Sequence, residues 1–199
     1  MKNNSTKILV TPRKTLFKQR EFQGFLPHHE FDYESVILDN HDYLERDLAE
    51  QDSSFQQPIP YAIIYNQDNH VFIYQRGSKG NEKRLTEKWS CGVGGHIDLI
   101  DKESSNPIYT SLLREIEEEL SLFDLQTIEL LGYINDDSVA VGEVHFGLLY
   151  KVICKQAPKT FAPEIIEGKF VHLDTLKDRL HEFETWSQFA LEHLFAQKK

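Results

Sequence analysis

One stretch of the sequence, residues 91–123, constrains the fold more than any other: CGVGGHIDLIDKESSNPIYTSLLREIEEELSLF. It begins with a glycine-rich loop and continues, after a polar interruption, into a segment whose apolar residues recur every three to four positions. These apolar residues are Tyr109, Leu112, Leu113, Ile116 and Leu120. Because this spacing is typical of an amphipathic helix, the stretch predicts a loop followed by a helix that buries one face.

The polar face of the predicted helix is acidic. At about 100° per residue, Glu115, Glu118 and Glu119 fall within a sector of roughly 100°. Glu115 and Glu119 are one helical turn apart, and carboxylates so close repel one another. Hard divalent cations such as Mg²⁺ bind oxygen ligands, and a bound ion would offset the repulsion. The glycines upstream leave the backbone open to close approach by another group.

These residues resemble the signature of the Nudix hydrolase family. The signature reads glycine, five residues, glutamate, seven residues, then Arg-Glu-apolar-any-Glu-Glu-any-Gly-apolar, and residues 114–122 (REIEEELSL) match its second half except at Ser121. Serine at the glycine position predicts a helix that ends without a left-handed glycine cap. If Gly95 opens the signature, Asp101 takes the first glutamate position. Twelve residues, instead of seven, then separate Asp101 from Arg114, which indicates an insertion around residues 104–107.

Three further stretches resemble one branch of that family, the predicted phosphoesterases with a Gly-Val-Gly-Gly-His-Ile loop. They are residues 58–61 (PIPY), 74–76 (YQR) and 142–147 (GEVHFG). The resemblance covers roughly residues 46–194 and implies an α/β fold, a Nudix-type α/β/α sandwich with a mixed β-sheet. The expected order of elements is compatible with such a layered arrangement: strands come first, then one acidic helix, then more strands and a C-terminal helix.

The resemblance also implies the metal site. Glu115, Glu118 and Glu119 are expected to hold Mg²⁺, or alternatively Mn²⁺, with a further contact from the carbonyl of Gly94. Arg114 is expected to orient the carboxylates by ion pairing. The ion would be the enzyme's cofactor.

The residue that activates water stays open between several carboxylates. In some family members the base is a glutamate of the signature, which here is Glu115. In others it lies on a later loop or strand, where Glu143 and Glu167 are the candidates. A carboxylate that is ionised near a metal can accept a proton at neutral pH.

Substrate contacts are expected from the basic segment that precedes the glycine loop. Its basic residues are Arg76, Lys79, Lys83, Arg84 and Lys88. Arginine binds phosphate through two parallel hydrogen bonds, so Arg76 and Arg84 are the candidates for phosphate contacts, together with Gly95 in the loop. A solvated surface segment without this role is an equal alternative.

Composition limits the class of protein. The chain has 199 residues, a formal net charge of −10 and two cysteines. Broad binding to nucleic acid or to an anionic membrane requires basic patches, so neither partner is expected, whereas a small phosphorylated substrate is compatible with a few well-placed arginines. Two cysteines are too few for a disulfide framework, and no signal peptide is evident, so we expect a cytoplasmic protein.

The expected domain organisation is an N-terminal extension over residues 1–55, packed on a Nudix hydrolase domain over residues 56–199. Phe17, Phe22 and Phe25 are expected to pack the extension onto the rest of the fold. The extension could cover the pocket or build the contact of a homodimer, and both alternatives are open.

Local patterns predict the remaining elements. Strands are expected at residues 7–11, 33–39, 128–134, 143–155 and 169–173, and a hairpin at residues 61–65 and 70–75 around the turn-rich residues 66–69. Helices are expected at residues 42–52, 174–180 and 184–197.

Three functions fit these observations. The first is a metal-dependent hydrolase that cleaves a diphosphate bond in a nucleoside diphosphate-linked or similar small substrate. The second is an isoprenoid diphosphate isomerase, which requires a catalytic cysteine and for which Cys91 is the candidate. The third is a non-catalytic module that binds a nucleotide-like ligand. The complete set of signature glutamates favours the hydrolase.

Overall fold

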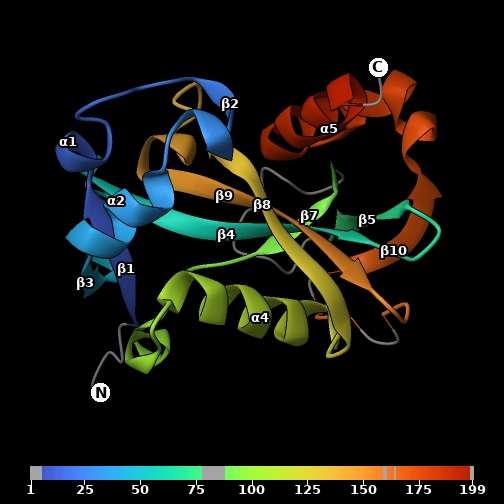
Figure 1. Cartoon of the computed structure of the whole chain (residues 1–199), viewed down its shortest axis with the longest axis horizontal. Helices are drawn as coiled ribbons and strands as arrows, with labels where there is room; N and C mark the ends of the chain where they lie inside the picture. Colours follow the sequence, from blue (N-terminus) through green and yellow to red (C-terminus); the bar gives the residue numbers. More distant parts are fainter. Residues whose placement is uncertain (1–5, 78–87, 159–160, 164, 198–199) are drawn as a thin grey trace. The chain divides into compact units, whose positions relative to one another are not determined.

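The computed structural model of the chain describes residues 6–77, 88–158, 161–163 and 165–197. Its strands are β1 (Lys7–Pro12), β2 (Gly24–Pro27), β3 (Asp42–Glu45), β4 (Phe55–Tyr65), β5 (His70–Arg76), β6 (Trp89–Ser90), β7 (Gly92–Gly94), β8 (Leu125–Asn135), β9 (His145–Cys154) and β10 (Ile165–His172). Its α-helices are α1 (Arg13–Leu16), α2 (Tyr33–Asn40), α3 (Arg46–Ala49), α4 (Pro107–Leu120) and α5 (Thr185–Gln197) (Figure 1). Its 3-10 helices are η1 (His28–Glu30), η3 (Leu99–Glu103), η4 (Gly142–Val144) and η5 (Leu173–Glu182).

The strands form a sheet in which hydrogen-bonded neighbours follow the order β10-β5-β4-β9-β8-β2. The chain divides into two compact units. The first comprises residues 1–60, 94–113 and 131–149, and the second comprises residues 61–93, 114–130 and 150–199. Strands β4, β8 and β9 and helix α4 each contribute residues to both units. The predicted division of the chain after residue 55 stays a prediction.

An aromatic cluster forms part of the core of the first unit. The ring of Phe146, which is fully buried, lies 5.1 Å from the ring of Tyr33 and 5.8 Å from that of Tyr133. Phe17 and Phe22, from the N-terminal segment, place their rings 5.8 and 6.0 Å from that of Phe146. The predicted packing of these two phenylalanines is therefore confirmed. In Figure 1, α1, α2, β1 and β3 of this unit lie side by side in blue.

Two predicted elements of the first unit are wrong. Residues 33–39 are helical, because Asp32 caps α2 by accepting a hydrogen bond from the Ser35 N–H at 3.0 Å, and because Tyr33 and Ile37, one turn apart, are both buried. Residues 42–52 begin with β3, which pairs with β1 in antiparallel register, and only α3 is helical. In this segment, pairing with a distant strand overrides the local helical pattern.

The second unit contains the predicted hairpin. Tyr65 of β4 pairs with Val71 of β5, and the turn between them places Asn69 in the left-handed region, with φ of 59°. Strand β10 pairs with β5 in antiparallel register from Ile165 to His172.

A buried polar cluster connects β4, β6 and α5 in the second unit. The hydroxyl of Tyr61 lies 2.6 Å from a carboxylate oxygen of Glu184, 2.8 Å from the Ser187 hydroxyl and 3.1 Å from the Ser90 hydroxyl. Glu184 also accepts hydrogen bonds from the N–H groups of Trp186 and Ser187, both at 2.9 Å, and so caps the start of α5.

Helix α4 confirms the helix predicted from the apolar spacing. Asn106 caps it by accepting a hydrogen bond from the Tyr109 N–H at 3.0 Å. The helix buries Ile108, Leu112, Ile116 and Leu120 completely. Its end differs from the prediction, because Ser121 has φ of 50° and donates its N–H to the carbonyl of Glu117 at 2.8 Å. The left-handed cap is therefore kept, with serine in the position that favours glycine. Across the described ranges, no helix has the length and apolarity needed to span a membrane.

Candidate active site

The acidic face of α4 is organised by Arg114. Its Nη1 atom lies 2.7 Å from Oε1 of Glu115 and 3.3 Å from Oε2 of Glu118. The side chain of Glu115 is only 13% exposed, whereas that of Glu118 is 60% exposed. Glu119, on the same face, is partly buried, and its carbonyl accepts the N–H of Ala162 at 2.9 Å. One guanidinium thus holds two of the three candidate ligands.

The donor set suits a hard divalent ion, since carboxylate oxygens are the ligands such ions prefer. In the part of the chain that the structure describes, no three His, Cys, Asp or Glu side chains are grouped closely enough to hold a metal ion. Two of the three carboxylates are instead paired with Arg114. The ligand atoms are therefore of the type that a divalent ion prefers, but the three carboxylates would have to move closer together to bind one.

The glycine loop is closely packed where it leaves β6. A Cβ atom on Gly92 would lie 2.1 Å from the ring of Tyr61, so this position cannot carry a side chain without a shift. The carbonyl of Gly92 accepts hydrogen bonds from the hydroxyls of Tyr74 at 2.9 Å and Ser90 at 3.1 Å. Gly94 and Gly95, the candidates for a metal contact and a substrate contact, are partly buried and belong to the first unit.

Asp101, the residue at the first glutamate position of the signature, is buried and forms hydrogen bonds with Asp98 at the start of η3. It is 2% exposed, and its Oδ2 accepts the N–H of Asp98 at 3.0 Å, while its own N–H donates to the carbonyl of Asp98 at 2.9 Å. The bond from the Asp98 N–H to the Asp101 carboxylate is one half of a capping box at the start of η3, and the other half runs from the Asp101 N–H to the side chain of Asp98.

Cys91, the candidate nucleophile of the isomerase alternative, is buried. It is 1% exposed, and its Sγ lies 3.9 Å from the carbonyl of Ser187. Burial raises the pKa of the thiol to about 12, so the thiol stays protonated at neutral pH. A buried, protonated thiol is a poor catalyst, and this disfavours the isomerase.

The candidate bases Glu143 and Glu167 lie in different settings. Glu143 is an exposed residue of η4 in the first unit, and its carbonyl accepts a hydrogen bond from Nε2 of Gln56 at 2.7 Å. Glu167 is exposed on β10 in the second unit, where its carboxylate pairs with Lys169 at 2.7 Å. The settings of the two residues do not decide which carboxylate activates water.

A histidine pair that sequence reasoning did not connect lies in the first unit. Nε2 of His96 is 2.7 Å from Oε1 of Gln57 and 3.2 Å from Nε2 of His145, whose Nδ1 is 2.6 Å from the carbonyl of Val141. Because a carbonyl or amide oxygen only accepts, Nδ1 of His145 carries a proton toward Val141, and Nε2 of His96 carries a proton toward Oε1 of Gln57. Burial, followed by the nearby charges of Arg46 and His145, lowers the pKa of His96 to about 3, so His96 is neutral.

Of the two arginines predicted to contact substrate, the structure describes the backbone of Arg76 but not Arg84. Arg76 is the last residue of β5, and its backbone is in register with Ile165 of β10. Arg84 lies outside the described residues. The role of both arginines stays a prediction.

The comparisons with known proteins identify the family. No protein-family model matches the chain. The chain is similar to the crystal structure of Tm1382, provisionally described as a Nudix hydrolase, with 28% identity and a TM-score of 0.82 over 96% of this chain and 99% of that one. Together with the glutamates on α4, this similarity shows that the chain belongs to the Nudix hydrolase family, whose members are diphosphate-hydrolysing enzymes. The predicted Nudix-type α/β fold is thereby confirmed.

Among curated proteins, the chain is 39% identical to Protein YmaB of Bacillus subtilis (strain 168), over 94% of this chain and 96% of that one. More distant structures share the fold alone. The NUDIX domain of Shewanella oneidensis NrtR, solved with ADP ribose, is 21% identical with a TM-score of 0.55, over 72% of this chain and 89% of that one. DR0079 from Deinococcus radiodurans is 18% identical with a TM-score of 0.51, over 70% of this chain and 82% of that one.

Proposed function

We propose that this chain is a cytoplasmic, divalent-metal-dependent hydrolase that cleaves the phosphoanhydride bond of a nucleoside diphosphate-linked or similar small substrate. The observation that carries the proposal is the acidic face of α4, where Arg114 holds Glu115 and Glu118 beside Glu119. The proposed ion is Mg²⁺ or Mn²⁺. When bound, it would screen the phosphate oxygens and acidify a water molecule.

The residues of the chain have separate roles in this proposal. Glu115, Glu118 and Glu119 bind the ion, with the carbonyl of Gly94 as a further contact. Arg114 keeps the carboxylates of Glu115 and Glu118 oriented, because it contacts both.

The proposed general base is Glu143 or Glu115. The carboxylate of Glu115 is engaged by Arg114 and partly buried, whereas Glu143 is exposed and its carboxylate can reach solvent. This difference favours Glu143 as the residue that accepts the proton of the attacking water. Gly95, Arg76 and Arg84 are the proposed contacts to substrate phosphates, and a homodimer is the proposed assembly.

One structurally similar protein indicates which class of substrate to test first. Because the NUDIX domain of NrtR was solved with ADP ribose, nucleoside diphosphates linked to a sugar are the first compounds to test. A non-catalytic binding module is the second candidate function, and it would bind such a compound without cleaving it.

The experiment incubates the purified protein with Mg²⁺ or Mn²⁺ and a panel of ADP-ribose, nucleoside diphosphate sugars, dinucleoside polyphosphates and nucleoside triphosphates. Cleavage is followed by chromatography of the monophosphate products. We expect turnover of at least one compound, and we expect Glu118→Gln to lower kcat/KM at least about a hundredfold, because metal ligation contributes several kcal/mol to the barrier.

Glu117→Gln is the matched control, since Glu117 is an exposed glutamate of the same helix outside the candidate set. It should leave kcat/KM within about twofold of the wild-type value. Binding of a panel compound without cleavage would support the non-catalytic module instead. Full activity of Glu118→Gln would remove Glu118 from the metal site.

A further inference from the structure

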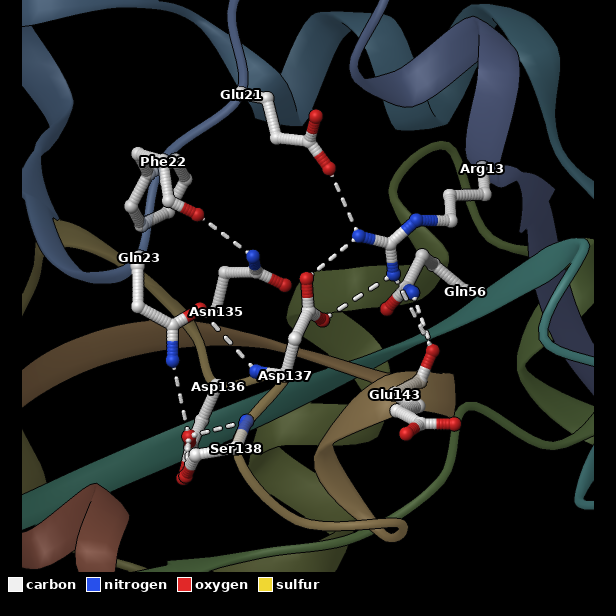
Figure 2. A network of polar contacts seen from close by, with 10 residues as sticks. All are labelled: Arg13, Glu21, Phe22, Gln23, Gln56, Asn135, Asp136, Asp137, Ser138 and Glu143. Carbon is white, nitrogen blue, oxygen red and sulfur yellow. Dashed lines mark hydrogen bonds and ion pairs between the residues drawn. The ribbon is translucent and has the colours of Figure 1, made fainter.

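Residues 136–143, in the segment between β8 and β9, are held at their start by Gln23. Nε2 of Gln23 donates to Oδ1 of Asp136 at 3.1 Å, and Oε1 of Gln23 accepts the N–H of Asp137 at 3.2 Å (Figure 2). Asp136 is fully buried, and its Oδ1 also accepts the N–H of Ser138 at 3.1 Å. We call residues 136–143 the base loop, because its last residue is the candidate base Glu143.

Arg13 connects the start of the base loop to its end. Its guanidinium forms a forked ion pair with Asp137, with Nη1 3.2 Å from Oδ1 and Nη2 2.7 Å from Oδ2. The same Nη1 lies 3.4 Å from the carbonyl oxygen of Glu143, which also accepts Nε2 of the buried Gln56 at 2.7 Å (Figure 2). One side chain of the N-terminal segment therefore contacts both the second and the last residue of the loop.

The interior of the base loop leaves little freedom to the backbone of Glu143. The N–H groups of Gly142 and Glu143 both donate to the carbonyl of Val139, at 2.9 and 3.2 Å. A Cβ atom on Gly142 would lie 1.7 Å from the carbonyl oxygen of Asp136, so the loop folds back onto its own start. The N–H and the carbonyl of Glu143 are thus both hydrogen-bonded, while its side chain is exposed.

Arg13 is itself fixed in place and charged. Its guanidinium lies 4.9 Å from the centre of the Phe17 ring and 2.9 Å from a carboxylate oxygen of Glu21, and its side chain is 25% exposed. The hydrogen bond to Asp137 raises the pKa of Arg13 above its ordinary value. Only a planar guanidinium can pair with a carboxylate through two nitrogens and still reach a carbonyl, so lysine would not replace it.

We propose that Arg13 is a positioning residue, which holds the base loop so that the carboxylate of Glu143 meets the attacking water. This inference rests on the proposed function, with Glu143 as the general base. A base must come within hydrogen-bond distance of the proton that it accepts, and a displacement of about 1 Å can cost about a hundredfold in rate. The N-terminal segment then contributes to turnover without contacting the substrate.

Arg13→Met removes the guanidinium and keeps much of the side-chain volume. We expect kcat to fall between about tenfold and a hundredfold on the panel compound that is turned over fastest, with KM within about twofold. Arg20→Met is the matched control, because Arg20 lies in the same segment and pairs with Glu30 at 2.6 Å, outside the base loop. An unchanged kcat in Arg13→Met would overturn the proposal.

A double variant separates positioning from general damage to the fold. If Arg13 acts through Glu143, Arg13→Met should lower kcat by less than about twofold when it is added to Glu143→Gln. A further tenfold loss in that background would show that Arg13 acts elsewhere. Full activity of Glu143→Gln would overturn the positioning role and leave the proposed hydrolase intact, since that function is tested independently with Glu118→Gln.

Hydrogen–deuterium exchange supplies a readout that needs neither metal nor turnover. We expect Arg13→Met to accelerate exchange in peptides covering residues 137–143, and Arg20→Met to leave it unchanged. If no panel compound is cleaved, the proposed function fails, whereas exchange still decides whether Arg13 holds the loop. If Arg13→Met does not fold, Asp137→Asn weakens the same ion pair and is expected to give the same acceleration; unchanged exchange would contradict the proposal.

Discussion

Replacement of Arg114 by methionine tests how the acidic face of α4 is held together. The variant removes the cation shared by Glu115 and Glu118 and leaves three carboxylates on one face of the helix. We expect it to destabilise the metal-free protein and to make stability more dependent on a divalent ion, because an ion can neutralise the carboxylates that Arg114 no longer pairs.

The magnitude follows from the two contacts of the guanidinium. The pair with Glu115, at 2.7 Å between side chains that are 20% and 13% exposed, corresponds to a charged hydrogen bond of about 1.5–3 kcal/mol. The pair with Glu118, at 3.3 Å and with Glu118 60% exposed, adds about 0–1 kcal/mol. We therefore expect a loss of about 1.5–4 kcal/mol, and at about 2–4 °C per kcal/mol a fall in Tm of about 3–16 °C.

Thermal unfolding in EDTA and in excess Mg²⁺ measures both effects. An ion at about 100 times its Kd stabilises the folded state by about 2.7 kcal/mol, and we expect a larger gain for Arg114→Met than for the wild-type protein. Arg46→Met is the control, since Arg46 pairs with Glu50 at 2.7 Å between side chains that are 43% and 42% exposed, worth about 0.3–0.5 kcal/mol. Equal losses in the two variants, or no response to Mg²⁺, would refute the reasoning.

Three further predictions concern single residues. Both cysteines are buried, and burial raises the pKa of each thiol, to about 12 for Cys91, so the native protein should react with no equivalent of a thiol reagent at pH 8 and the denatured protein with two. Gly142→Ala should destabilise the protein by about 1–3 kcal/mol in chemical denaturation, because its Cβ would overlap the carbonyl of Asp136. Ser121→Gly should stabilise by about 0.5–1 kcal/mol, because glycine adopts the observed φ of 50° without strain.

Each of these has a result that contradicts it. Rapid labelling of Cys91 in the native protein would show that this thiol is accessible and would again support the isomerase alternative. Val141→Ala alters an exposed side chain of the same loop, so a loss equal to that of Gly142→Ala would mean that steric overlap is not the cause. A lower stability of Ser121→Gly would show that the serine side chain contributes more than the strain costs.

Local patterns in the sequence predicted the elements whose signals are short-range. The apolar spacing of residues 109–120 gave α4, and the turn residues between Tyr65 and His70 gave the hairpin of β4 and β5. The strand expected at residues 33–39 is wrong because the cap formed by Asp32 starts a helix in a run that includes Val36 and Ile37. Aspartate is a favoured N-cap residue, so Asp32 is the sequence signal for a helix that starts at this point.

The contacts around the base loop could not be predicted, because they join residues far apart in the chain. Arg13 and Asp137 are separated by 124 positions, and Gln56 and Glu143 by 87. Neither pair leaves a periodic or spacing signal. The signature glutamates could be found because one helix presents them together, whereas the support of Glu143 is assembled by folding.

Binding of Mn²⁺ to the protein, followed by the electron paramagnetic resonance signal of the free ion, tests the central proposal most directly. We predict that the wild-type protein binds Mn²⁺, that Glu118→Gln weakens binding at least about tenfold, equivalent to about 1.4 kcal/mol, and that Glu117→Gln does not change it. No binding by the wild-type protein, or equal affinity in all three proteins, would contradict a metal site on the acidic face of α4.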